Sequence, residues 1–304
     1  MAVPLRAMST LGALLAAFES TSAEPNAGPE QPFGFEPFAL PVRAFAHSLS
    51  PFGAEVRLLE AMDADPLPPQ WIERLVPLNG TGVDTATLAE SGANATTQLA
   101  ALLRHLATLP QSEQPTLTWR CGFGRDFWEN MALVRAGKAL VLSHFETTGQ
   151  AVFVLKVEAC ALAAAMTEAD GYSNLLRLSQ VALSAHTAGV DSVYLPEFAK
   201  EAKGLESLRE RIDQVVAHES RVHSYAQGQK GAYWPTLLAA KMMLASRELA
   251  ASGQDLAEIA AQTLAEKRQA VASGKRVWVG QTAYTNNSLT VAGPAARATA
   301  EWAA

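Results

Sequence analysis

The chain has 304 residues, a formal net charge of −6, 49% hydrophobic residues and 18% charged residues. This length fits one large domain or two small ones, and the composition is typical of a globular protein with a large core. The negative charge argues against nucleic acid or an anionic membrane as the main partner, because both need a concentrated basic face. No apolar run reaches the roughly 18 residues of a membrane span. Cys121 and Cys160 lack CxxC spacing, so we expect no disulfide framework and a cytoplasmic location.

Two interpretations remain open for the start of the chain. Residues 1–23 have the outline of a secretory signal peptide, with a positive residue, an apolar run and small residues. They also fit a short amphipathic helix, whose apolar stripe is Leu11, Leu14, Leu15 and Phe18. Residues 22–41 are rich in Pro, Gly, Glu and Ser, and they carry Phe33, Phe35 and Phe38. We therefore assign residues 1–40 to an N-terminal helix and a linker whose aromatic side chains dock on a neighbouring surface.

Short β-like runs alternate with longer helical runs in the rest of the chain. The predicted strands are Val42–His47, Ile72–Leu78, Leu117–Phe123, Val152–Val157, Ser192–Leu195 and Val277–Tyr284. The predicted helices are Asn94–Leu109, Phe127–Ser143, Tyr172–Thr187, Thr236–Ser252 and Gln254–Ser273. In the first of these helices, leucines recur at i, i+3, i+4 and i+7, and Pro110 ends it. The alternation predicts parallel strands joined by crossover helices, and hence an α/β architecture.

Several segments resemble the barrel domain of the methylmalonyl-CoA mutase family. Thr116–Leu140, Met166–Phe198 and Leu208–Ser220 look like consecutive blocks of that domain, in the same order and at similar spacing. Glu219–Trp234 keeps the Gly and aromatic positions of a further block, and Glu266–Asn286 is similar to the closing piece of the barrel. Among family members, the chain looks most like the small, non-catalytic subunit of a heterodimeric mutase. The resemblance implies a TIM-barrel-like α/β domain over residues 41–287 and a C-terminal tail over 288–304.

The number of strands is too small for a complete barrel. A closed (β/α)₈ barrel has eight strands in about 250 residues, whereas the sequence predicts five good strands and a weaker sixth. We therefore expect a shortened or irregular barrel, or an open sheet whose exposed edge a partner covers.

The positions that carry chemistry in the family hold different residues here. Within Val83–Ala100, the Tyr-His pair of catalytic mutases falls on Ala86 and Thr87, which cannot donate a strong hydrogen bond to a developing oxyanion as imidazole does. In Lys156–Thr167, Glu158 and Cys160 take the places of a His and a Gln. The resemblance thus implies that this chain has no catalytic residues of the mutase reaction.

Three sequence patterns typical of cofactor or metal sites are absent or have the wrong spacing. The sequence has no DxHxxG motif, whose His ligates cobalt in relatives, so we expect no cofactor on this chain and adenosylcobalamin on a partner chain. His218, Glu219 and His223 resemble an HExxH site, but histidines five apart on a helix do not share one metal, so we expect no metal. Cys121–Gly124 lacks phosphate-loop spacing, and we expect turn or bulge glycines.

Two functions from different classes follow from these observations. The first is a non-catalytic subunit that stabilises the catalytic large chain of an acyl-CoA mutase. A non-catalytic chain of this kind could also form a homodimer, or be a degenerate relative without a partner. The second is a self-standing enzyme that uses Glu158, Cys160 or Arg125 on acyl-CoA or another small molecule. In the first case we expect Cys160 to be a buried, inert thiol, and Glu158 to reach solvent or pair with Lys156 or Arg125.

Overall fold

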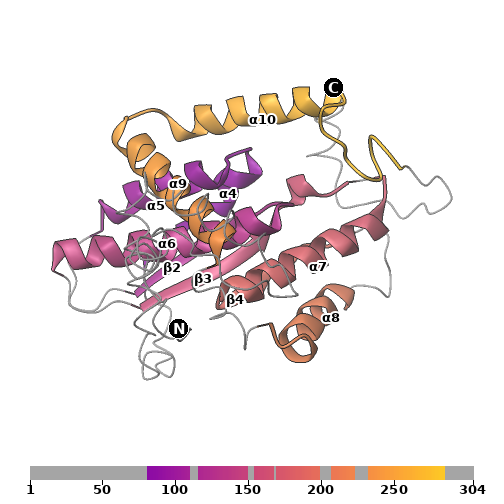
Figure 1. The fold of residues 1–304 in the computed structure, drawn as a ribbon, viewed down its shortest axis with the longest axis horizontal. Coiled ribbons are helices and arrows are strands. Elements are labelled where there is room, and N and C mark those ends of the chain that lie inside the picture. The colour runs from indigo at the N-terminus through magenta and orange to yellow at the C-terminus, as the bar shows by residue number, and fades with distance from the viewer. Residues whose placement is uncertain are drawn as a thin grey trace, which may run out of the picture.

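The structure is a computed structural model that describes residues 81–109, 116–149, 154–167, 169–198, 207–222 and 232–284. Within these residues the chain is an α/β protein built on one parallel sheet (Figure 1). Its strands are β1 (Thr81–Asp84), β2 (Thr116–Phe123), β3 (Val154–Ala161) and β4 (Ser192–Tyr194). Its helices are α4 (Ala86–Glu90), α5 (Ala95–Leu106), α6 (Phe127–Thr148), α7 (Gly171–Ala188), α8 (Leu208–Gln214), α9 (Tyr233–Ala251) and α10 (Leu256–Ala272). Two short turns, η5 (Ala163–Ala165) and η6 (Val215–Glu219), complete the described elements.

The strands lie side by side in the order in which they occur in the chain, β1-β2-β3-β4. All three pairings are parallel, and the register aligns Asp84 with Arg120, Arg120 with Glu158, and Glu158 with Ser192. Connections between neighbouring parallel strands are almost always right-handed. In a sheet of this order, right-handed crossovers put α5, α6 and α7 on the same face.

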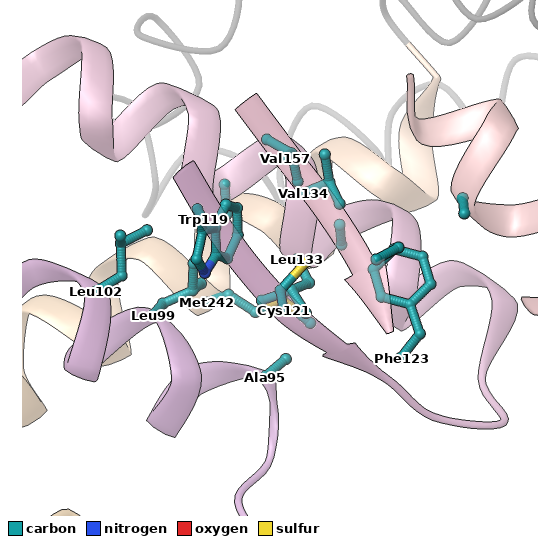
Figure 2. Close-up of a cluster of buried hydrophobic side chains, with 14 of the residues drawn as sticks. Ala95, Leu99, Leu102, Trp119, Cys121, Phe123, Leu133, Val134, Val157 and Met242 are labelled. Atoms are coloured by element: carbon teal, nitrogen blue, oxygen red, sulfur yellow. The ribbon is translucent and has the colours of Figure 1, made fainter. Parts of the chain in front are cut away.

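The hydrophobic core lies between this face of the sheet and the helices (Figure 2). Alternate residues of β2 point into it, and Trp119, Cys121 and Phe123 are completely buried. They meet apolar side chains of α5, α6 and α9, including Leu99, Leu133 and Met242. The alternation follows from the period of two in a strand, which sends successive side chains to opposite faces.

Helix α9 packs against both α5 and α6, and an arginine fixes its C-terminal end. The Arg104 guanidinium, on α5, donates hydrogen bonds to the carbonyls of Ala250, Leu249 and Gln254 at 3.2, 3.1 and 2.8 Å. The last carbonyls of a helix have no partner within the helix, and a cation also interacts favourably with the helix dipole there. Arg104 thus joins two helices that are distant in sequence.

Local signals explain where the long helices begin and end. A side-chain oxygen of Asn94, Asp126, Asp170 and Asp255 accepts a backbone N–H in the first turn of α5, α6, α7 and α10, respectively. Such N-caps typically contribute about 1 kcal/mol each. Gly189 follows α7 with a φ of 69°, in the left-handed region that glycine adopts without strain. The five predicted helices are therefore confirmed, with small shifts at their ends.

Several strand predictions differ from the structure. The predicted strand Val277–Tyr284 is wrong, because this segment forms a tight turn with a single bridge between Val279 and Ala283 and joins no strand of the sheet. Strand β3 continues to Ala161, four residues beyond its predicted end. The prediction missed β1, whereas Val42–His47 and Ile72–Leu78 lie outside the described residues. The α/β class with parallel strands is confirmed.

No helix of the described part of the chain is long and apolar enough to cross a lipid bilayer.

Candidate functional site

The face of the sheet that points away from α5, α6 and α7 carries polar and charged side chains. Its central row runs across all four strands as Asp84, Arg120, Glu158 and Ser192. The next row toward the carboxyl ends of the strands contains Gly122, Cys160 and Tyr194. We call Asp84, Arg120, Glu158, Cys160 and Tyr194 the strand-face cluster. In parallel α/β sheets, ligands bind near the carboxyl ends of the strands, so this cluster is the candidate site.

Arg120 is the centre of the strand-face cluster. Its Nε lies 3.1 Å from Oε1 of Glu158, and its Nη1 lies 3.7 Å from Oδ2 of Asp84. The same Nε donates to Sγ of Cys160 at 2.8 Å, and the guanidinium carbon lies 5.4 Å from the centroid of the Tyr194 ring. One cation therefore contacts two carboxylates, a thiol and an aromatic ring from three neighbouring strands.

The Cys160 thiol is protonated at neutral pH. Burial raises its pKa from the ordinary value of 9.0 to about 11, although the hydrogen bond and charge of Arg120 oppose the shift. The carboxylate of Glu158 acts in the same direction as burial, and Sγ lies 3.6 Å from Oε1 of Glu158. A thiolate is the nucleophilic form of cysteine, so this environment suits an unreactive thiol. Arg120 itself has a raised pKa, mainly because of its hydrogen bond to Cys160.

Helix α4 closes the carboxyl end of β2. A Cβ added to Gly122 would lie 2.6 Å from Cβ of Ala89 and 2.7 Å from Cδ2 of Leu162, so only glycine fits between them. Ala86 lies in the same helix, is 5% exposed, and has its Cα 3.4 Å from that added Cβ. The expected turn or bulge at Cys121–Gly124 is thus wrong for its first three residues, which belong to β2 and pack tightly against α4. Small side chains fill the space directly above this strand.

Thr87 has a local role at the start of α4. Its backbone N–H and its hydroxyl donate to the Asp84 carboxylate at 3.1 and 3.0 Å. The backbone N–H of Ala86 donates to the same carboxylate at 2.9 Å. Asp84 therefore links the end of β1 to the start of α4, in addition to its contact with Arg120.

The other end of α4 is bound to the segment after β3. The Glu90 carboxylate accepts hydrogen bonds from the backbone N–H groups of Ala163 and Ala164 at 2.7 and 3.0 Å. Glu90 thus ties α4 to the turn η5. Gly92 follows with a φ of 110°, and a Cβ there would come within 2.6 Å of the Ala260 carbonyl oxygen on α10. The chain therefore turns tightly between α4 and α5, in contact with α10.

A buried amide completes the sheet where β1 ends. Gln98 of α5 accepts a hydrogen bond from Gly122 N at 2.7 Å and donates one to Gly122 O at 3.0 Å. The Thr85 hydroxyl lies 3.3 Å from Oε1 of Gln98 and accepts the indole N–H of Trp119 at 3.0 Å. Because β1 stops at Asp84, Gln98 supplies the hydrogen bonds that a longer strand would have made to Gly122.

The three predicted alternatives for a catalytic group do not come together. Glu158 and Cys160 are neighbours on the same face of β3, but within the strand rather than beyond its end. Arg125 lies elsewhere, with its guanidinium carbon 4.3 Å from the centroid of the Trp278 ring. Neither Lys156 nor Arg125 pairs with Glu158; its cation is Arg120.

The sequence did not predict Asp84, Arg120 and Tyr194 as members of the cluster. A signal existed, because Arg120 is a charged residue that alternates with the buried residues Trp119 and Cys121 in β2. The same alternation in β3 puts Glu158 between Val157 and Ala159. Only the register between the strands brings the two charges together.

No group of three or more potential metal ligands occurs in the part of the chain that the structure describes. His218 lies in η6, whereas His223, the second histidine of the HExxH-like pattern, is outside the described residues.

Comparison with known proteins gives no relative: no protein-family model matches the chain, and no curated protein matches it.

Proposed function

We propose that this chain is a non-catalytic, small-subunit-like member of the methylmalonyl-CoA mutase family, which stabilises a catalytic acyl-CoA mutase chain by packing against it. In this proposal the complex acts in the cytoplasm, and adenosylcobalamin binds to the partner chain. Both cysteines of the chain are buried and free of disulfide bonds, which suits a reducing compartment.

The sheet topology supports the barrel part of the proposal. Four parallel strands in chain order, with their connecting helices on one face, are the arrangement from which a (β/α)₈ barrel is built. In a barrel, the opposite face points inward and its strand ends carry the active site. The described strands form an open sheet rather than a closed barrel, so in this proposal the face that carries Asp84, Arg120 and Glu158 is left for the partner chain.

The observation that carries the non-catalytic function is the closure of β2 by α4. Ala86 and Thr87, at the family's Tyr-His position, belong to a helix that packs against Gly122 or bonds to Asp84. Ala89 and Leu162 also lie close to Gly122, so protein side chains occupy the space next to this strand end, which supports a filled site rather than an open pocket. In this proposal no residue of the chain binds the corrinoid, and the cofactor belongs to the partner chain.

The second candidate function, a divergent enzyme, is favoured by one contact. Arg120 Nε lies 2.8 Å from Cys160 Sγ, and a neighbouring cation is a common way to activate a thiol. Burial and Glu158 nevertheless keep the pKa of Cys160 above its ordinary value. This function therefore has the weaker support.

The polar face of the sheet is the surface that we assign to the partner. Tyr194 is 48% exposed there, next to the half-exposed Arg120 and Glu158. The strand that carries it, β4, has no second neighbouring strand among the described residues. An aromatic side chain and an arginine in contact are residue types that dominate binding energy at protein interfaces.

Co-purification with a catalytic mutase chain from the same source tests the proposal. We expect light scattering to show a stable heterodimer, and we expect the chain alone to give no turnover of methylmalonyl-CoA with added adenosylcobalamin. Tyr194→Ala should weaken the complex about tenfold or more. Tyr172→Ala is the matched control, since Tyr172 is 41% exposed on α7, outside the assigned surface. A stable monomer that does not bind the catalytic chain, or turnover by the chain alone, would contradict the proposal.

A further inference from the structure

Two arginines from different elements meet at one buried tryptophan. Arg125, two residues after β2, stacks its guanidinium on the Trp278 ring, and Trp278 is completely buried. Arg177, on α7, donates from Nη2 to the carbonyl of Val279, the next residue, at 2.6 Å. Gln180 of α7 donates to the backbone carbonyl of Arg125 at 2.5 Å and so holds the β2–α6 loop against α7.

A third arginine, Arg276, precedes Trp278 by two residues and is exposed. The pKa of Arg125 is lowered to about 10, mainly by burial, and the charges of Arg276 and Arg177 act in the same direction. The geometry places two of the arginines at consecutive residues, because Arg125 lies over the Trp278 ring and Arg177 binds the carbonyl of Val279. Arg276 belongs to the same segment, two residues before Trp278.

These three cations have no close anionic partner in the described part of the chain. None of the ion pairs found there involves Arg125, Arg177 or Arg276. Burial lowers the pKa of Arg177, and the charge of Asp170 opposes this shift. The Asp170 carboxylate, however, accepts hydrogen bonds from the hydroxyl and the backbone N–H of Ser173 at the start of α7. Burial also lowers the pKa of Lys267, and the charge of Glu129 opposes that shift. Lys267 and, to a smaller extent, Arg276 oppose the raised pKa of Glu129, which burial causes. No carboxylate contributes to the pKa of Arg125.

We propose that Arg125, Arg177 and Arg276 form a binding site for a phosphate group beside Trp278. The guanidinium carbon of Arg125 lies 4.3 Å from the centroid of the Trp278 ring, and its N–H groups donate to no described residue, so they can bind an oxyanion. A phosphate has three or four oxygens and up to two negative charges, and it can accept hydrogen bonds from several arginines at once. The site is separate from the strand-face cluster and does not depend on the proposed function.

The overall charge of the chain restricts the ligand to a small molecule. A net charge of −6 does not favour the phosphate backbone of a nucleic acid, whose binding requires a long basic surface. The phosphate is therefore either the free inorganic ion or part of a small molecule such as a nucleotide or coenzyme A.

Isothermal titration calorimetry with the whole chain tests the site, with inorganic phosphate, ADP and coenzyme A as probes at constant ionic strength. We expect binding of at least one probe, and tighter binding of ADP or coenzyme A than of phosphate identifies an organic ligand. Arg125→Met keeps an apolar chain of similar length on Trp278, and we expect it to lower the affinity at least about tenfold. Arg125→Lys retains the charge and should bind with intermediate affinity.

Arg211→Met is the control variant, because Arg211 is an exposed arginine on α8, outside the site. It should bind the probes as the unchanged protein does. Without ligand, the Tm of Arg125→Met should be unchanged or higher, since the substitution removes one of three neighbouring like charges. The proposal fails if none of the three probes binds to the unchanged chain, or if Arg125→Met binds them with the same affinity.

Discussion

The six-membered ring of Trp119 lies directly against Gly137, and the two residues fix the distance between β2 and α6. A Cβ at position 137 would come within 2.2 Å of Cη2 and of Cζ3 of the indole. Trp119 is completely buried and its indole N–H is bonded to Thr85, so the ring cannot move aside without loss of that hydrogen bond. Position 137 of α6 is therefore a glycine, because the Trp119 indole occupies the space that a side chain would need.

We expect Gly137→Ala to lower the free energy of unfolding. The added methyl group overpacks the core, which typically costs about 1–3 kcal/mol. The higher helix propensity of alanine, worth up to about 1 kcal/mol, offsets only part of this cost. The midpoint of urea denaturation measures the change. Gly124→Ala is the matched control, because a Cβ at position 124 has no atom within 4 Å, and its effect should stay within about 0.5 kcal/mol.

Cys160 should react slowly with iodoacetamide in the native protein. A pKa of about 11, against 9.0 for an ordinary thiol, reduces the thiolate fraction at neutral pH by about a hundredfold. The labelling rate, followed by mass spectrometry of the Cys160 peptide, should rise about tenfold for each pH unit between pH 7 and 9. Cys160→Ala should change stability by no more than about 1–2 kcal/mol. Rapid labelling at neutral pH, with loss of a measurable activity, would favour the divergent enzyme.

The same raised pKa predicts how stability depends on pH. The thiol remains protonated in the folded chain up to about pH 11, whereas in the unfolded chain it ionises near pH 9.0. Ionisation in the unfolded state alone favours unfolding, so the contribution of Cys160 to stability is complete below pH 9 and decreases between pH 9 and 11. Thermal unfolding of the unchanged protein and of Cys160→Ala should therefore differ in slope across this range. Equal slopes would show that Cys160 has an ordinary pKa.

Arg120 and Glu158 should shift the reactivity of Cys160 in opposite directions. Arg120 lowers the pKa of the thiol and Glu158 raises it. Arg120→Met should therefore slow the alkylation of Cys160, and Glu158→Gln should accelerate it. Each variant should change the free energy of unfolding by no more than about 1 kcal/mol, since the pairs are partly exposed to solvent.

Lys156→Met provides the control for these two variants. Lys156 is on the same strand, two residues from Glu158, and does not contribute to the pKa of Cys160. Its substitution should leave the labelling rate unchanged. If all three variants changed the rate alike, the effect would come from a general opening of the sheet rather than from the charges.

Gln98→Leu should destabilise the protein by about 2 kcal/mol or more. The substitution removes both hydrogen bonds to Gly122 and leaves a buried backbone N–H and C=O without partners, each of which costs about 1–3 kcal/mol. Chemical denaturation measures the loss. Gln262→Leu, at an exposed position of α10, controls for the change of residue type and should have an effect below about 0.5 kcal/mol. Equal effects of the two substitutions would mean that Gln98 does not complete the sheet.

The sequence alone was sufficient for the helices, because their signals are local. The leucines at i, i+3 and i+4 in α5, the N-caps Asn94 and Asp170, and Gly189 after α7 all act within a few residues of chain. Strands β2 and β4 were also close to their predicted positions. The alternation of strands and helices was enough to predict parallel pairing.

The failed strand prediction has a different physical cause. Val277–Tyr284 begins with the β-favouring run Val277–Val279, but a strand is stable only when a neighbour pairs with its backbone, and the sequence does not reveal the neighbour. In the structure, Trp278 instead packs against Arg125 and the segment turns back on itself. Strand β3 was predicted too short, and its last residues, up to Ala161, are held by pairing with β2.

The sequence by itself determined the α/β class, the positions of the long helices and a carboxylate and a thiol two residues apart near the end of a strand. Only the tertiary structure decided which groups meet. The cation beside Glu158 is Arg120, 38 positions earlier in the chain, because strand register aligns the two residues. Arg125 instead stacks on Trp278, which the sequence separates from it by more than half of the described chain. Contacts of this kind depend on the docking of distant segments, and no local pattern in the sequence encodes them.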